Sequence, residues 1–173
     1  MRTNTPEIQI RAFTEQDATA VAELFYHTVH SVNAADYNEE QLNAWAPAEV
    51  LAEDWSHRFD GRLAVVAMSS GEVVGFADMD VERCYLDRLY VHRDYQRCGV
   101  GTALCDVLES ACPVGSVISV HASLTAEPFF LSRGYRLETR QQVLCRGVLM
   151  NNCLMCKTLQ STIYNLQSTI SAR

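Results

Sequence analysis

The fold is decided by the stretch Leu89-Tyr-Val-His-Arg-Asp-Tyr-Gln-Arg-Cys-Gly-Val-Gly-Thr-Ala-Leu104. Its apolar start is typical of a strand, and a helix is predicted to begin beside Gly99 and Gly101. Glycines let the backbone approach a ligand, and a helix start presents unpaired N–H groups and the positive end of the helix dipole. A strand, a glycine loop and a helix in this order predict a phosphate-binding loop.

Two other phosphate motifs are excluded at this loop. Leu104 stands where GxGxxG would need its third glycine, and Gly101 is followed by Thr102 and Ala103 instead of Lys and Ser or Thr. These departures disfavour a mononucleotide or dinucleotide fold. The GxG spacing alone is also compatible with a tight strand-to-helix turn that binds nothing.

The segments on both sides of this loop predict an α+β domain. Hydrophobic alternation predicts strands over 8–12, 63–68, 73–79, 85–91 and 117–121 and two more around Cys145-Arg-Gly147. Helical spacing and capping residues predict helices over 14–32, 38–45, 48–57, 101–111 and 125–133, the last one capped by Thr125 and ended by Gly134. We assign one domain over 1–158 and a tail over 159–173, in which LQSTI occurs twice.

Composition limits the class of protein. The net charge of −7 and pI near 5.2 lack the basic footprint of a duplex nucleic-acid binder, so no nucleic acid is expected. This charge suits a cationic small substrate, although acidic surfaces also serve solubility. No apolar run approaches the roughly 18 residues that cross a bilayer, so no membrane partner is expected. The odd, scattered set of seven cysteines indicates a reducing cytoplasm, and Cys153-Leu-Met-Cys156 lacks the second ligand pair of a metal site.

The loop and its flanks resemble a known family. Gln96-Arg-Cys-Gly99-Val-Gly101, preceded by Leu89-Tyr-Val91, resembles the Q/R-x-x-G-x-G/A motif of the GNAT acetyltransferases. The resemblance spans roughly residues 8–157. Residues 25–30 and 40–47 resemble most closely those of an uncharacterised bacterial branch of the family. It implies a GNAT fold, with a mixed, mostly antiparallel sheet of about seven strands and a splay between strands 4 and 5. It also implies acetyl-CoA as cosubstrate and transfer of its acetyl group to a primary amine of a small molecule by direct attack.

The resemblance also implies which residues hold acetyl-CoA. In the family, amides at the positions of Arg97 to Thr102 wrap the pyrophosphate, and main-chain groups of Leu89 and Val91 bond the pantetheine. Segment 126–135 resembles another family motif, but Phe130 stands where many members place a tyrosine that protonates the departing thiolate, and Thr125 where many have asparagine. The implied cofactor-binding residues are Leu89, Tyr90, Val91, Gln96, Arg97, Cys98, Gly99, Val100, Gly101, Thr102, Phe130 and Arg133.

An alkylamine is mostly protonated at neutral pH, so the site needs a proton acceptor. Asp87 is the first candidate and His30 the second, with Tyr85 as a third catalytic candidate on the strand that borders the acyl group. Each has an alternative: Asp87 can form a local salt bridge with Arg88, and His30 can pack at a helix end. His121 ends a strand beside the predicted splay, where it either approaches the substrate or is merely structural.

Three further possibilities stay open at the level of sequence. Protein or peptide N-acetylation would need an open groove. A non-catalytic acyl-CoA-binding module is suggested by Phe130 in place of the tyrosine. A homodimer is possible because edge strands and the repetitive tail can pair.

Overall fold

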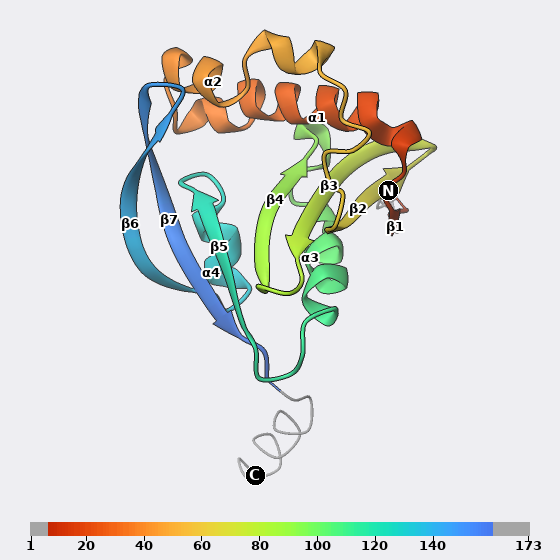
Figure 1. Cartoon of the computed structure of the whole chain (residues 1–173), viewed down its shortest axis with the longest axis vertical. Helices are drawn as coiled ribbons and strands as arrows, with labels where there is room; N and C mark the ends of the chain where they lie inside the picture. Colours follow the sequence, from red (N-terminus) through yellow and green to blue (C-terminus); the bar gives the residue numbers. More distant parts are fainter. Residues whose placement is uncertain (1–6, 161–173) are drawn as a thin grey trace, which may run out of the picture.

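The computed structural model describes residues 7–160, which fold around one seven-stranded sheet (Figure 1). The strand order is β1-β2-β3-β4-β5-β7-β6, and only the β4–β5 pair is parallel. The predicted α+β sheet of about seven strands is therefore confirmed. The strands are β1 (Gln9–Ala12), β2 (Leu63–Ser69), β3 (Glu72–Asp80), β4 (Tyr85–Val91), β5 (Val117–Ser123), β6 (Arg136–Cys145) and β7 (Val148–Thr158).

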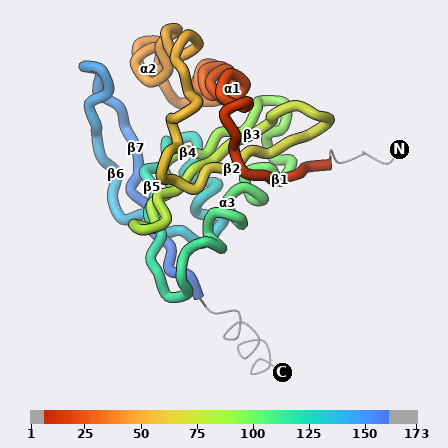
Figure 2. The backbone as a smooth tube through the Cα atoms, turned by 45° about the vertical axis from the view of Figure 1, so that its right-hand side comes forward, coloured from red at the N-terminus to blue at the C-terminus, as the bar shows by residue number. Residues whose placement is uncertain are grey.

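Helices cover both faces of the sheet (Figures 1 and 2). They are α1 (Ala18–Ser31), α2 (Glu39–Trp45), α3 (Val100–Ser110) and α4 (Glu127–Ser132). One core layer joins α3 and α4 to the sheet through residues such as Leu104 and Phe130, and the other joins α1 and α2 through Val21 and Leu42. Neighbouring strand residues alternate between the two layers, as Val65 and Val66 do, because successive side chains of a strand point to opposite faces.

Local capping signals confirm some of the predicted helix ends. Asn38 Oδ1 accepts a hydrogen bond from the Gln41 amide at 2.9 Å, and Gln41 Oε1 accepts one from the Asn38 amide at 3.0 Å, which starts α2. Gly134 follows α4 with a φ of +87°, a left-handed conformation that ends the helix.

The predictions for two helices were wrong in part. Segment 48–57 forms only the 3₁₀ helix η3 (Ala48–Ala52), and Asp54 Oδ1 then accepts a bond from the Ser56 amide in a local turn that competes with helix. Helix α4 begins at Glu127, so Thr125 does not cap it. Ser123 Oγ accepts the bond from the Ala126 amide at 3.1 Å, while Thr125 bonds a residue from another part of the chain.

The predicted splay separates β4 from β5. These strands pair only at Tyr85 with Ser119 and Leu86 with Val120, and beyond this point they diverge. The register between β3 and β4 shifts at the same place, because Asp78 faces Arg88 while Met79 faces Leu86, leaving Asp87 as the extra residue of a bulge. The bulge and the opening of the sheet thus coincide.

The end of the described chain still contacts the domain. Leu159 exchanges backbone hydrogen bonds with Gly115 and Ser116 at 2.8 and 2.9 Å. Most of the predicted tail, including almost all of the two LQSTI segments, lies outside the described residues. Within 7–160, none of the helices combines the length and apolarity that crossing a bilayer requires.

Candidate active site

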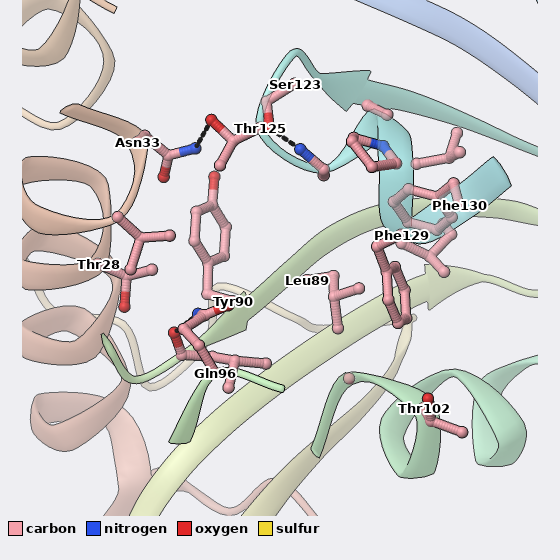
Figure 3. Close-up of a pocket in the computed structure, with 18 of the residues that line it drawn as sticks. Thr28, Asn33, Leu89, Tyr90, Gln96, Thr102, Ser123, Thr125, Phe129 and Phe130 are labelled. Atoms are coloured by element: carbon pink, nitrogen blue, oxygen red, sulfur yellow. Dashed lines mark hydrogen bonds between the residues drawn. The ribbon is translucent and has the colours of Figure 1, made fainter. Parts of the chain in front are cut away.

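A cleft of about 710 Å³ lies where β4 and β5 separate (Figure 3). This volume is in the range of pockets that enclose small molecules. Its walls come from β4, the start of α3, β5, α4 and the α1 end of the helical layer. Residues from the α3 side include Leu89, Gly101 and Phe129, and residues from the α1 side include Asn33 and Tyr90.

The start of α3 has free hydrogen-bond donors. Gly99 precedes the helix with a φ of +83°, and the first bond of the helix runs from the Ala103 amide to the Gly99 carbonyl at 3.0 Å. Among the described residues, no backbone carbonyl accepts from the amides of Val100, Gly101 or Thr102. Unpaired amides at the positive end of a helix dipole attract phosphate groups.

The loop before α3 is held in place by β4. Gln96 Nε2 donates a hydrogen bond of 2.6 Å to the carbonyl of Val91, which ties the loop to the end of the strand. Gly101 then passes close to α4, since a Cβ added to it would stand 3.3 Å from two ring atoms of Phe129. A side chain at Gly101 would therefore crowd the floor of the cleft.

The backbone of β4 offers hydrogen-bonding groups to the cleft. The His92 amide donates to Val74 of β3 at 2.9 Å, so His92 and Tyr90 direct their main-chain groups toward β3. By alternation, Leu89 and Val91 direct theirs toward the gap that β5 has left. This geometry suits an extended ligand that lies along the strand edge.

The structure brings most of the predicted cofactor residues together. Nine of the twelve line the cleft: Leu89, Tyr90, Val91, Gln96, Arg97, Gly99, Gly101, Thr102 and Phe130. The other three do not line it. Val100, the first residue of α3, is fully buried against β3, Cys98 Sγ contacts the Gln96 carbonyl, and Arg133 pairs with Asp106 and Glu109. Contact of any of the twelve with the cofactor stays a prediction.

Asp87 lies at the bulge and lines the cleft. Its Oδ2 atom pairs with Arg88 Nη1 at 3.0 Å and Arg62 Nη2 at 3.4 Å, so the local salt bridge considered from the sequence is present. Both arginines also contact Asp78, which is fully buried. Burial raises the pKa of the Asp78 carboxyl, although both guanidinium groups oppose this shift.

The other catalytic candidates lie in different places. Tyr85 contacts His121, with its hydroxyl oxygen 3.1 Å from His121 Nδ1, and His121 lines the cleft. Burial raises the pKa of the Tyr85 hydroxyl, so it keeps its proton at neutral pH. His30 does not line the cleft. Its Nε2 atom is 2.8 Å from the Ala46 carbonyl, and its ring packs on Tyr26.

Bonds between distant segments cover the α1 end of the cleft. Asn33 Nδ2 donates to Thr125 Oγ1 at 3.1 Å across the opening (Figure 3). The buried Tyr37 hydroxyl accepts from the Leu124 amide at 2.9 Å and donates to the Asn151 carbonyl at 2.7 Å. Sequence reasoning did not identify Asn33 or these bonds, because the partners are about 90 or more residues apart and no local motif marks them.

The cleft also holds a half-buried aromatic pair. Trp45 Nε1 donates to the Tyr90 hydroxyl at 3.1 Å, and both residues line the cleft. Burial raises the pKa of Tyr90, so its hydroxyl is neutral. Across residues 7–160, no three His, Cys, Asp or Glu side chains are grouped to bind a metal ion.

A strand splay beside a glycine loop and helix start is what the family resemblance implies, and comparison with known proteins agrees. The model of the acetyltransferase (GNAT) domain family matches residues 33–152. The chain therefore belongs to the GNAT acetyltransferase family. It is an acetyltransferase enzyme with acetyl-CoA as its cosubstrate.

Individual relatives support the same assignment. The chain is 32% identical over 148 residues to the uncharacterized N-acetyltransferase YafP of Escherichia coli, covering 86% of this chain and 94% of YafP. A GCN5-related N-acetyltransferase from Rhodopseudomonas palustris, described as "Aminotransferase, Class-II", has a similar structure, with a TM-score of 0.81, 35% identity and coverage of 92% and 99%. The PaiA N-acetyltransferase of Thermoplasma acidophilum, solved with coenzyme A, shares the fold at 17% identity, with a TM-score of 0.67 and coverage of 88% and 99%.

Proposed function

We propose that the protein transfers the acetyl group of acetyl-CoA to the primary amine of a small cationic molecule. The observation that carries this proposal is the carboxylate at the splay. Each arginine makes its shortest contact with Asp87 at Oδ2, and within residues 7–160 no side chain or amide donates a hydrogen bond to Oδ1. A carboxylate oxygen open to the cleft binds an ammonium group by a charge-assisted hydrogen bond.

The covered end of the cleft favours a small acceptor. The Asn33–Thr125 bond and the Tyr37 hydroxyl join the helical layer to the β5–α4 loop and β7. These bonds stand where a long peptide would have to pass along an open groove. A small amine fits within the remaining volume without breaking them.

Acetyl transfer then follows from the positions of the α3 start and the β4 edge in the cleft. The free amides at the start of α3 hold the pyrophosphate of acetyl-CoA, and the main chain of Leu89 and Val91 aligns the pantetheine along the gap. The Leu89 amide polarises the thioester carbonyl, and the bound amine attacks its carbon. Phe130 has no hydroxyl, and a thiol of pKa near 8 to 9 leaves as the thiolate without a dedicated acid.

We also propose that the protein is located in the cytoplasm, and this proposal rests on the cysteines. All seven are free thiols, and four of them are buried. Free thiols in this number suit a reducing compartment.

The test is thiol release from acetyl-CoA with a panel of primary amines, with the acetylated products identified by mass spectrometry. We expect Asp87→Asn to raise the KM for the amine about 10- to 100-fold, the equivalent of losing a hydrogen bond between charged groups. The acetyl-CoA Kd should stay unchanged. Asp60→Asn is the matched control, since this carboxylate is 74% exposed and outside the cleft. Turnover of peptides but of no small amine would overturn the proposal.

A further inference from the structure

We propose that His121 accepts the proton of the attacking amine and that Tyr85 positions its ring. This assignment rests on the proposed amine acceptor. His121 is exposed, lines the cleft, and directly follows the last β5 residue that pairs with β4. It therefore stands at the apex of the splay, beside the gap in which the thioester must lie.

The sheet places His121 on the side from which the amine approaches. Its neighbours Val120 and Ala122 belong to the core layer of α3 and α4, so His121 faces the opposite side. The cofactor loop at Gly99 and Gly101 lies on the α3 side of the cleft. A thioester that spans the gap thus meets the cofactor loop on one face and His121 on the other.

Tyr85 points from β4 to the same face and fixes the imidazole. Tyr85 pairs with Ser119, two residues before His121, so their side chains share a face, and the Tyr85 oxygen is 3.1 Å from His121 Nδ1. When Nδ1–H donates to this oxygen, the lone pair of Nε2 is free to accept a proton. Tyr85 is a positioning residue in this arrangement.

The other candidates are less suited to accept the proton. Asp87 is already engaged by two guanidinium groups on Oδ2, and its remaining oxygen is the proposed ammonium-binding atom. The bond of His30 Nε2 to the Ala46 carbonyl requires a proton on that nitrogen, and the ring does not reach the cleft. Once His121 is protonated, the carboxylate of Asp87, which lines the same cleft, stabilises the imidazolium.

Few charged groups face His121 from the elements beside it. On the β4 side they are Tyr85 and Asp87, with Arg62, Arg88 and Asp78 behind them. On the β7 side Leu154 lies opposite His121, and two residues further along is the Cys156 thiol, whose pKa is raised by burial, with Glu138 and Arg136 of β6 beside it. Neither the Tyr85 hydroxyl nor the Cys156 thiol changes charge near neutral pH, because burial raises both pKa values.

The chemical step balances without another reactant. The amine nitrogen forms a bond to the carbonyl carbon of the thioester, the C–S bond breaks, and its electron pair leaves on the CoA sulfur. The bound ammonium group first gives one proton to Nε2 of His121, which releases it to solvent, and the nitrogen loses its second proton by the same route as the amide forms. The products are the acetylated amine and the CoA thiolate.

The experiment measures thiol release with 2-phenylethylamine and its 2,2-difluoro analogue, an amine of nearly equal size that is much less basic. We expect His121→Gln to lower kcat/KM for 2-phenylethylamine about 10²- to 10⁴-fold and to remove the acidic limb of the pH profile between about pH 5 and 8. The loss should be smaller with the difluoro amine, because a much larger fraction of it is already neutral. His57→Gln, a control at a histidine 71% exposed, should keep both features.

Tyr85→Phe tests the positioning role separately. We expect it to lower kcat and, in ¹⁵N NMR of His121, to move the population from the Nδ1–H to the Nε2–H tautomer. An unchanged tautomer would contradict this role. Equal losses for the two amines, or a normal pH profile in His121→Gln, would overturn the assignment of His121.

Failure of the amine proposal has a different signature. If the wild-type protein acetylates no amine, thiol release to water still requires a proton acceptor and is measured in the same assay without amine. A His121-dependent water reaction would then support the role of His121 while the amine acceptor is rejected. A water reaction that does not depend on His121 would reject both.

Discussion

Removal of one hydroxyl, by Tyr37→Phe, should loosen the covered end of the cleft. Tyr37 is 6% exposed, and its hydroxyl joins the helical layer to the Leu124 amide and the Asn151 carbonyl at 2.9 and 2.7 Å. Each net hydrogen bond contributes about 0.5–1.5 kcal/mol, and the partly buried amide and carbonyl left behind add to the cost. We expect the free energy of unfolding to fall by about 2–3 kcal/mol. For a domain of this size the Tm should fall by about 4–12 °C.

The assay is urea denaturation together with the KM for the amine. Leu124 lies between Ser123 and Thr125, which line the cleft, so the KM should rise while acetyl-CoA binding stays unchanged. Tyr26→Phe is the matched control, because the Tyr26 hydroxyl makes no hydrogen bond within residues 7–160, and we expect it to change stability by less than about 0.5 kcal/mol. A loss below about 1 kcal/mol for Tyr37→Phe, or equal losses for both variants, would refute the reasoning.

Two further predictions concern the cofactor loop and the first helical layer. Gly101→Val places side-chain atoms against Phe129, since a Cβ alone would stand 3.3 Å from its ring. We expect calorimetry to show acetyl-CoA binding weakened at least about tenfold. Unchanged binding would contradict the assignment of this loop to the phosphates. The hydrogen bond with Arg11 lowers the pKa of the Asp17 carboxyl in the folded protein. The ionised carboxylate therefore stabilises the fold at pH values above its unfolded pKa near 3.9, and this stabilisation is lost as the pH falls through the lower folded pKa. Asp17→Asn should lower the free energy of unfolding by about 1–2 kcal/mol at pH 7 and make the urea midpoint fall less steeply below about pH 4. Parallel plots of urea midpoint against pH for the wild type and the variant would exclude this role of Asp17.

The sequence predicted those parts of the fold whose signals lie within a few residues. The bounds of β4 were predicted correctly from hydrophobic alternation, and α2 from the reciprocal pair of Asn38 and Gln41. The helix expected over 48–57 ends early because a turn around Asp54 competes with it. Thr125 has the side chain of a helix cap, but it bonds Asn33, and a partner so distant in sequence leaves no local signal.

The difference between local signals and contacts of distant residues also explains why the cofactor half of the site is easier to predict than the acceptor half. The proposed acetyl-CoA site consists of backbone groups of one contiguous stretch, in which glycines at fixed spacing mark the close approach of the ligand. The acceptor face joins Asp87 and Tyr85 of β4 to His121 of β5 and Asn33 at the end of the helical layer. In the proposed mechanism one bulged residue, Asp87, links the two halves, because the bulge accompanies the splay in which the thioester would lie and its carboxylate would bind the amine. Changes in the helical layer can therefore alter the acceptor while the loop before α3 still binds the same cosubstrate.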